Sequence, residues 1–436
     1  MLTIQISPSS SPIFPPFVLP VHHPRPLLFP APPCAANDPP TSPTPINIDA
    51  LLGDAVMPDV DLDLHHWQRE AGASFNPDGR ATTFGNDKQA IEALGSGVVL
   101  YDASHFARVR VAAPARTALL ATTTRDLTAR KPQEALEACL IEPTTGAVVD
   151  VVTICVQPNA HLILGSPGAT AAISTLLTDR LADIDMSQKS SIQDLSGTTG
   201  LLLLAGPEAI HVLEELGVAP DILATATDAA MDYTRTAMLN FEGHPVVLIA
   251  GGPLGSHIPA VMLLAAEEAV PELYRQLALR GCILMGDVAF DRARILAGRP
   301  IRGTEYGLEG TPRGREMKDD DIRGWDMSPM DLAQGHAVDA IYQSKPGEGS
   351  ATRTSCTLWG LRMQFGAPLE VGDEVVDAES GETVGVVTSA TNDASGFAFG
   401  MTRVTYVENV TDKKVLVHGK SGFLESPPAM TRAASM

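Results

Sequence analysis

The sequence predicts an α+β protein that ends in a small β-barrel. Between about residues 80 and 310, segments typical of antiparallel strands alternate with single helical segments. After residue 355, five short apolar and β-branched runs are separated by turn residues, which is typical of a barrel or sandwich. The chain has 436 residues, enough for about two or three domains of roughly 100–200 residues each.

The N-terminal segment, residues 1–55, differs in composition from the rest. Its first 45 residues contain fourteen of the 34 prolines and no acidic residue before Asp38. Such a segment cannot form regular backbone hydrogen bonds or bury a core. Its serines and its position favour a transit peptide, with a disordered tail as the alternative. Because prolines interrupt any amphipathic helix and Arg25 is the only early arginine, we expect a plastid address, with the mitochondrion as the alternative.

Residues 56–310 are expected to form an α+β region of two subdomains, because the order of strands and helices repeats in outline. The expected strands are residues 98–101, 107–111, 136–141, 148–156, 161–164, 201–204 and 260–264. The expected helices are residues 86–95, 114–120, 169–181, 208–216, 266–280 and 288–297. Turn residues at 144–146 and 242–243 predict hairpins, so an antiparallel arrangement is favoured over a doubly wound sheet.

Residues 311–354 are polar, with few apolar positions at regular spacing, and are interpreted as a linker. Residues 355–425 are expected to form the barrel. Its predicted strands are residues 357–363, 374–376, 383–388, 397–406 and 415–417.

Composition excludes several classes of function. The formal charge of −21 argues against nucleic-acid binding, which relies on lysine and arginine. The longest apolar runs are far shorter than the roughly 18 residues of a membrane helix. The five cysteines are odd in number and widely spaced, so neither a disulfide framework nor a metal site is predicted. Buried free thiols are expected at Cys139, Cys155 and Cys282.

No general catalytic signature is present, but three side chains are candidates for chemistry. Asp150 interrupts an apolar strand, and a buried carboxylate needs hydrogen bonds or a ligand; the alternative is a partly exposed strand-edge residue. His105 follows a strand and is interpreted as a packing histidine. Arg294 lies near the end of a helix, where surface charge is the alternative to a binding role.

Five blocks of sequence occur in a fixed order along the chain. They are YDASHFARVRV (residues 101–111), TTTRDL (122–127), TGAVVDVV (145–152), LAGPEA (204–209) and RILAGRPIRGTEYG (294–307). Together they resemble the folate-binding aminomethyltransferase family, which includes the glycine-cleavage T-protein and the YgfZ-type proteins that support iron–sulfur enzymes. The resemblance is closest to the plastid YgfZ-like folate-binding proteins.

The resemblance implies a three-domain fold around a central hole that binds tetrahydrofolate, with a C-terminal β-barrel. Carried over by position, Asp150 stands where the family places an Asp facing the folate nitrogens. Phe106 stands where an apolar residue lines the pterin site, and Arg294 where an Arg helps to hold the ligand. Asp150 is thus both the candidate catalytic residue and, with Phe106 and Arg294, a candidate cofactor-binding residue.

Two stretches depart from the family pattern. The T-protein has a motif with glycine and glutamate, YTGExG, where residues 251–259 of this chain read GGPLGSHIP, without Glu. Residues 342–349 align with the YgfZ-type motif KGCYxGQE, but Ser344 replaces its cysteine and Glu348 is displaced by one position. Gly347 and the downstream Arg353 match. This degenerate motif lacks the thiol nucleophile that the family pattern carries.

Three functions follow as hypotheses. The first is a tetrahydrofolate-binding protein that supports iron–sulfur cluster assembly or repair, with assembly proteins or client enzymes as partners. The second is a folate-dependent one-carbon transferase that moves an aminomethyl or methyl group. The third is a non-catalytic scaffold of the same fold, which the degenerate motif favours. Whether the chain is an enzyme stays open between them.

Overall fold

The computed structural model describes residues 63–112, 115–184, 191–218, 234–255, 258–307, 356–392, 397–405 and 413–425. Within these residues the predicted α+β class and the C-terminal barrel are confirmed. Several predicted features lie outside them: the N-terminal segment 1–55, the whole linker 311–354, and within it the motif residues Ser344, Gly347, Glu348 and Arg353.

Most of the strands before residue 307 belong to one 11-stranded sheet, in the order β13-β3-β9-β12-β11-β10-β5-β6-β7-β4-β8. The first half consists of β3 (Val99–Asp102), β9 (Thr199–Ala205), β10 (Thr234–Phe241), β11 (His244–Ala250), β12 (Ala260–Ala266) and β13 (Ile283–Met285). The second half consists of β4 (Phe106–Ala112), β5 (Glu134–Ile141), β6 (Val148–Val156), β7 (Ala160–Pro167) and β8 (Ile192–Asp194).

The two halves are joined by a short pairing of β10 with β5. All neighbours in the sheet are antiparallel except β13 and β3, which are parallel. The expected hairpins between β5 and β6 and between β10 and β11 are both present. The prediction against a doubly wound sheet is therefore confirmed.

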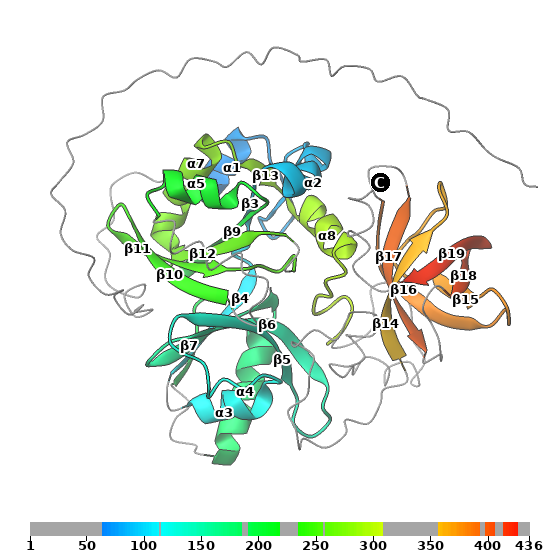
Figure 1. Cartoon of the computed structure of the whole chain (residues 1–436), viewed down its shortest axis with the longest axis horizontal. Helices are drawn as coiled ribbons and strands as arrows, with labels where there is room; N and C mark the ends of the chain where they lie inside the picture. Colours follow the sequence, from blue (N-terminus) through cyan, green and yellow to red (C-terminus); the bar gives the residue numbers. More distant parts are fainter. Residues whose placement is uncertain are drawn as a thin grey trace, which may run out of the picture. The chain divides into compact units, whose positions relative to one another are not determined.

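Helices pack on both halves (Figure 1). In the first half, α5 (Ala209–Glu215) and α7 (Val270–Leu279) cover one face, and α2 (Asp87–Ser96) and α8 (Asp287–Leu296) pack on the other. In the second half, α3 (Arg116–Thr122) and α4 (Thr170–Ile184) cover the outer face. The inner faces share one core cluster, in which Leu203 of β9 and Leu164 of β7 both take part.

Smaller elements precede this core. They are α1 (Leu64–Glu70), which packs on α7, and the two-stranded sheet of β1 (Ser74–Phe75) and β2 (Ala81–Thr83). A short 3-10 helix, η5 (Glu267–Ala269), precedes α7, where one continuous helix over residues 266–280 was expected. The predicted buried thiols Cys139, Cys155 and Cys282 are confirmed as free and buried.

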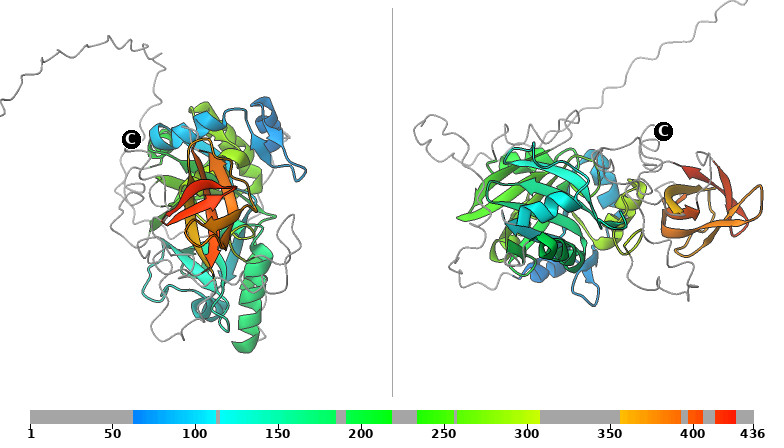
Figure 2. Two further views of the ribbon diagram at one scale, coloured as in Figure 1. Left: turned by 90° about the vertical axis from the view of Figure 1, so that its right-hand side faces the viewer. Right: turned by 90° about the horizontal axis from the view of Figure 1, so that it is seen from below.

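The C-terminal barrel, coloured orange to red in Figure 2, closes in the order β14-β17-β16-β15-β18-β19. Its strands are β14 (Cys356–Met363), β15 (Glu374–Asp377), β16 (Thr383–Asn392), β17 (Ala398–Thr405), β18 (Lys414–Val417) and β19 (Lys420–Glu425). The sequence predicted five of these strands and missed β19. This strand contains a charged residue at each end and Gly422, but it closes the barrel by pairing with both β14 and β18.

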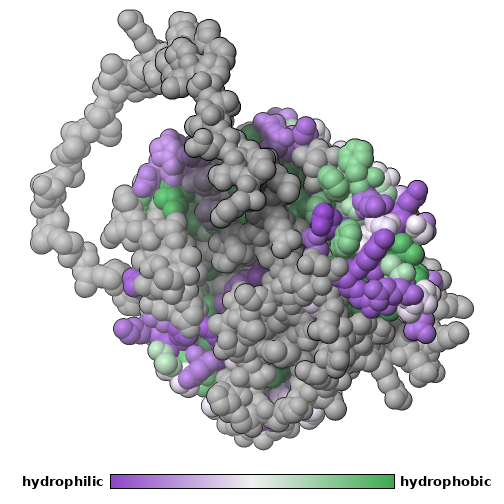
Figure 3. Space-filling view, turned by 45° about the vertical axis from the view of Figure 1, so that its right-hand side comes forward, coloured by the Kyte–Doolittle hydropathy of each residue, from purple (hydrophilic) through white to green (hydrophobic). Residues whose placement is uncertain are grey.

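Apolar side chains at the surface lie among polar ones. Figure 3 shows green and purple residues side by side on the face that it brings forward. The large exposed hydrophobic residues include Phe365 and Val371 of the barrel and Leu279 at the end of α7. Among the described residues, no helix is both long and apolar enough to cross a bilayer.

A substitution at Gly206, which lies between β9 and α5, tests this packing. Its φ is +119°, and a Cβ there would lie 2.4 Å from the Gly97 carbonyl oxygen and 2.9 Å from that of Ala93. We expect Gly206→Ala to lower the free energy of unfolding by about 1–3 kcal/mol, because both backbone strain and a backbone clash are introduced. Chemical denaturation measures the change.

The matched control is Gly95→Ala in α2, where an added Cβ has no atom within 4 Å. An exposed helical glycine replaced by alanine should raise the free energy of unfolding by about 0.5–1 kcal/mol. Equal stability changes in the two variants would contradict the packing described for Gly206.

Candidate functional site

A cavity lies where the inner faces of the two half-sheets meet the segment that follows α8. Its empty volume is about 620 Å³, its open mouth included. Residues of the second half, such as Phe106 and Thr153, line it together with Leu201 and Met262 of the first half. The segment after α8 contributes residues 299–301. Three parts of the sequence that are far apart therefore form one concave site, as in most ligand pockets.

Aromatic rings form one side of this cavity. Phe106, at the start of β4, and Phe290 of α8 both line it, with ring centroids 5.7 Å apart and planes at 86°. Tyr101, which is not among the lining residues, stacks on Phe290 with ring centroids 4.4 Å apart and planes at 2°. The predicted site residue Phe106 is thus placed on the wall of the cavity, within a small aromatic cluster.

Glu137 and Arg299 are the charged pair in this cavity. Glu137 of β5 lies opposite Thr153 of β6, and both line the cavity. The Arg299 guanidinium donates a close hydrogen bond to the Glu137 carboxylate. The aliphatic stem of Arg299 lies against Gly255, where an added Cβ would be 3.3 Å from its Cδ. The pair connects β5 to the segment after α8 across the cavity.

Asp150 is fully buried, and its carboxylate accepts four hydrogen bonds. The donors are the Ser166 amide at 2.8 Å, the Ser166 hydroxyl at 2.7 Å, the Tyr306 hydroxyl at 2.8 Å and the Val151 amide at 2.9 Å. The ladder between β6 and β7 runs only from Thr153 to Val156 on the β6 side, so the carboxylate connects the two strands beyond that ladder. The strand-edge alternative does not describe this residue, because it is buried and bonded on both oxygens.

The Asp150 side chain points to the helix-covered face of the sheet. A Cβ added to Gly165 would meet both Asp150 Oδ2 and the Ile173 side chain of α4 at about 2.5–2.6 Å. Asp150 lies opposite Leu140, which belongs to the core cluster under α3 and α4, and Asp150 is not among the residues that line the cavity. The connection between Asp150 and the cavity is Ser166, which lines the cavity and donates to Asp150 twice. Burial raises the pKa of Asp150, and its donors oppose that shift only in part.

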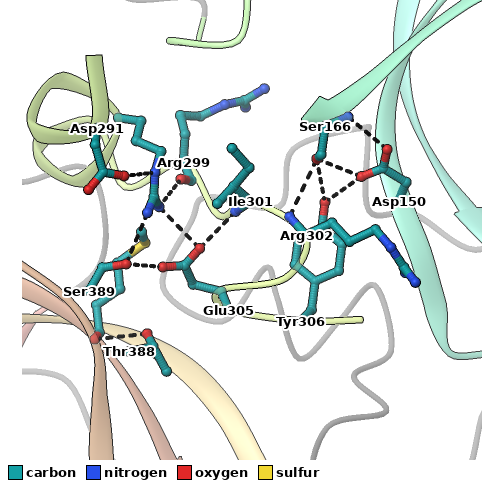
Figure 4. A network of polar contacts seen from close by, with 12 residues as sticks. Asp150, Ser166, Asp291, Arg299, Ile301, Arg302, Glu305, Tyr306, Thr388 and Ser389 are labelled. Atoms are coloured by element: carbon teal, nitrogen blue, oxygen red, sulfur yellow. Dashed lines mark hydrogen bonds and ion pairs between the residues drawn. The ribbon is translucent and has the colours of Figure 1, made fainter. Parts of the chain in front are cut away.

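Arg294 lines the cavity, but protein acceptors take up most of its guanidinium. Its Nε donates to Asp291 at 2.6 Å, and its Nη1 to Glu305 at 3.1 Å and to the Arg299 carbonyl at 3.3 Å. Its Nη2 donates to Ser389 of the barrel at 3.1 Å. Figure 4 shows this network beside the Asp150, Ser166 and Tyr306 group. Burial would lower the pKa of Arg294, but Glu305 and Asp291 hold it above its usual value.

His105 lies behind the aromatic wall. Its Nε2 is 3.3 Å from the Tyr101 hydroxyl, which donates to Asp287 at 2.9 Å. Burial lowers the pKa of His105 to about 3, with Arg80 and Arg108 adding to the shift. The imidazole is therefore neutral at neutral pH, as a packing histidine would be.

Of the site residues predicted from the sequence, Phe106 and Arg294 line the cavity. The sequence analysis did not predict the lining residues Glu137, Arg299 and Phe290. It also did not predict Tyr306, which donates to Asp150. A signal for Glu137 was present, because it interrupts the apolar strand EALEACLI much as Asp150 interrupts its own. Tyr306 and Arg299 lie in the block of residues 294–307, where only Arg294 was singled out. Within the described residues, no group of three or more His, Cys, Asp and Glu side chains could hold a metal ion.

Comparison with known proteins places this geometry in a family. Residues 63–315 match the family described as the GCVT N-terminal domain. A chloroplastic protein of Arabidopsis thaliana named "Putative transferase" is 27% identical over 349 residues, which cover 80% of this chain and 74% of that protein. The aminomethyltransferase of Parasynechococcus marenigrum is 27% identical over 312 residues, 70% of this chain and 78% of that enzyme.

The crystal structure of glycine cleavage system aminomethyltransferase T from Bartonella henselae has the same fold. It superposes with a TM-score of 0.66 at 19% identity, covering 84% of this chain and 96% of that one. The predicted fold, with its C-terminal barrel, is therefore confirmed. The family match spans more than half of the sequence, and the chain belongs to the GCVT family of aminomethyltransferase-like proteins.

Proposed function

We propose that this chain binds a reduced folate, tetrahydrofolate or one of its derivatives, in the cavity lined by Phe106 and Phe290. The observation that carries the proposal is the composition of that cavity. It combines two aromatic rings with one carboxylate, Glu137, and two guanidinium groups, those of Arg294 and Arg299. Family membership supports the same ligand class, since the relatives include aminomethyltransferases.

The residues present fit such a ligand. A reduced pterin has a flat apolar surface that suits the rings of Phe106 and Phe290. The folate tail is anionic and calls for a guanidinium in a chain of charge −21. Tetrahydrofolate, when bound, would supply a ring nitrogen that carries a one-carbon group.

The role of Asp150 in this proposal is to position a wall of the cavity. Its carboxylate holds the amide and hydroxyl of Ser166, and Ser166 lines the cavity. Arg294 acts in a similar way, because its Nη1 holds the Arg299 carbonyl. Asp150 and Arg294 thus contribute to the site through Ser166 and Arg299.

We further propose that the folate-loaded chain supports iron–sulfur cluster assembly or repair in a plastid. The resemblance to YgfZ-type proteins supports the role, and the chloroplastic relative supports the compartment. The mitochondrion is the alternative compartment. One-carbon transfer is the second candidate function, and the names of the relatives favour it.

Phe106→Ala tests the cavity directly. We expect the affinity for 5-formyltetrahydrofolate to fall about 10–100-fold, because stacking on an aromatic ring contributes about 1–3 kcal/mol. Titration calorimetry of residues 56–436 measures the affinity. The control is Phe365→Ala, whose phenyl ring is 70% exposed on the barrel and should be neutral. Equal affinities in the two variants would place the ligand elsewhere.

Asp150→Asn tests the positioning role. The amide nitrogen cannot accept, so it opposes either the Ser166 amide or the three donors at the other oxygen. We expect the free energy of unfolding to fall by about 1–3 kcal/mol, with weaker folate binding as the wall loosens. Asp179→Asn, on the exposed side of α4, is the control. A variant with unchanged stability and affinity would show that Asp150 does not position the cavity wall.

Complementation of a bacterial strain that lacks its YgfZ protein tests the iron–sulfur role. Because Ser344 replaces the motif cysteine, we expect the native chain to restore iron–sulfur enzyme activity poorly. Replacement of residues 342–349 by KGCYKGQE should increase the rescue. Full rescue by the native chain would show that the thiol is dispensable, and failure of both chains would favour the scaffold function.

A further inference from the structure

Two arginines line the cavity, and their bonding differs. Arg294 is 3% exposed and spends its donors on Asp291, Glu305, Ser389 and the Arg299 carbonyl. Its ion-pair partner Glu305 is fully buried and also accepts from the Ile301 amide at 2.8 Å. Redirecting this guanidinium to a ligand would leave a buried carboxylate unpaired, which costs several kcal/mol.

Arg299 is in a different position. It pairs with the carboxylate of Glu137, which itself lines the cavity. The side chains are 14% and 28% exposed, so water reaches both ends of this pair. A second carboxylate that enters the cavity can replace Glu137 at Arg299 while the guanidinium stays paired throughout. The displaced Glu137 can then be solvated at the mouth, so the exchange avoids a buried unpaired charge.

We propose that Arg299 binds the carboxylate arm of the ligand and that Glu137 occupies Arg299 until the ligand arrives. The inference rests on the proposed folate function and deepens it. Arg299 then selects a folate that carries glutamate over a bare pterin. Glu137 lowers the affinity for that folate, because the ligand carboxylate must displace it from Arg299.

The anchoring of Arg299 supports this assignment. Its carbonyl accepts from Arg294 Nη1 and its stem rests against Gly255, so the residue is fixed at its backbone while the guanidinium reaches Glu137 of β5. A planar guanidinium can bind a carboxylate through two parallel N–H bonds, which gives geometric selectivity as well as charge. The neighbouring cavity residues Pro300 and Ile301 carry no charged group.

The experiment compares two probes, tetrahydrofolate and 6-methyltetrahydropterin, under anaerobic conditions. The second probe has the reduced ring but no carboxylate. We expect Arg299→Gln to weaken tetrahydrofolate binding at least ten-fold and to change 6-methyltetrahydropterin binding less than two-fold. Glu137→Gln should tighten tetrahydrofolate binding several-fold, because the competing carboxylate is gone. Arg292→Gln, on α8 but outside the cavity lining, is the control and should alter neither affinity.

The outcomes separate this inference from the proposed function. If the unaltered chain binds neither probe, the folate proposal itself fails. If it binds tetrahydrofolate and Arg299→Gln binds it equally well, the folate proposal stands and the role of Arg299 is overturned. If Glu137→Gln weakens both probes alike, Glu137 accepts from the ring, and its role as a displaced partner of Arg299 is overturned.

A second variant covers the case in which Arg299→Gln does not fold. Arg299→Lys keeps the charge but loses the bidentate geometry, so it should weaken tetrahydrofolate alone by several-fold. In the unaltered chain, raising the salt concentration should likewise weaken tetrahydrofolate more than 6-methyltetrahydropterin. Equal salt dependence of the two probes would contradict a carboxylate contact.

Discussion

The buried ion pair between Arg294 and Glu305 is the interaction on which the rest of the site depends. Arg294 belongs to α8 and Glu305 to the segment that follows it, and Ser389 of the barrel donates to Glu305 and accepts from Arg294. A buried pair is stable only when its remaining donors and acceptors are satisfied. Here the Ile301 amide and the Arg299 carbonyl complete that requirement. The wall formed by residues 299–301 is therefore fixed by the same bonds that attach the barrel strand.

Sheet geometry decides which polar strand residues can reach a ligand. Asp150 and Glu137 both interrupt apolar strands, and they lie on neighbouring strands β6 and β5. Asp150 is opposite Leu140 on the helix-covered face, whereas Glu137 is opposite Thr153 on the cavity face. The two carboxylates therefore have different roles in this sheet. Asp150 connects β6 and β7 beyond their ladder, whereas Glu137 faces the cavity and is partly exposed to solvent.

Much of the fold could be predicted from the sequence, because most elements show clear periodicity between turn residues. The missed elements were short or had mixed composition, such as β13 with three residues and β19 with a charge at each end. The site was less predictable. An apolar strand reveals that Asp150 is buried but not which face it lies on, since both faces of this strand carry apolar side chains. The pairing of Glu137 with Arg299 spans 162 positions and has no local signal.

Family membership and the particular residues of this chain contribute different parts of the account. The match over residues 63–315 places the chain in its family and supports the ligand class that we propose. The Glu137–Arg299 pair is a feature of this chain's own cavity and bears on which ligand within that class is preferred. The departure at residues 342–349 replaces the cysteine of the YgfZ-type motif by Ser344 and concerns the chemistry that follows binding. Binding can therefore be examined separately from turnover.

The central claim, that the cavity binds a reduced folate, is tested most directly by a crystal structure of the chain grown with 5-formyltetrahydrofolate. The account predicts density for the pterin ring beside Phe106 and Phe290, with the glutamyl end toward Arg299. Ligand density confined to another part of the molecule would contradict the account. So would a cavity without ligand density at a concentration far above the measured dissociation constant.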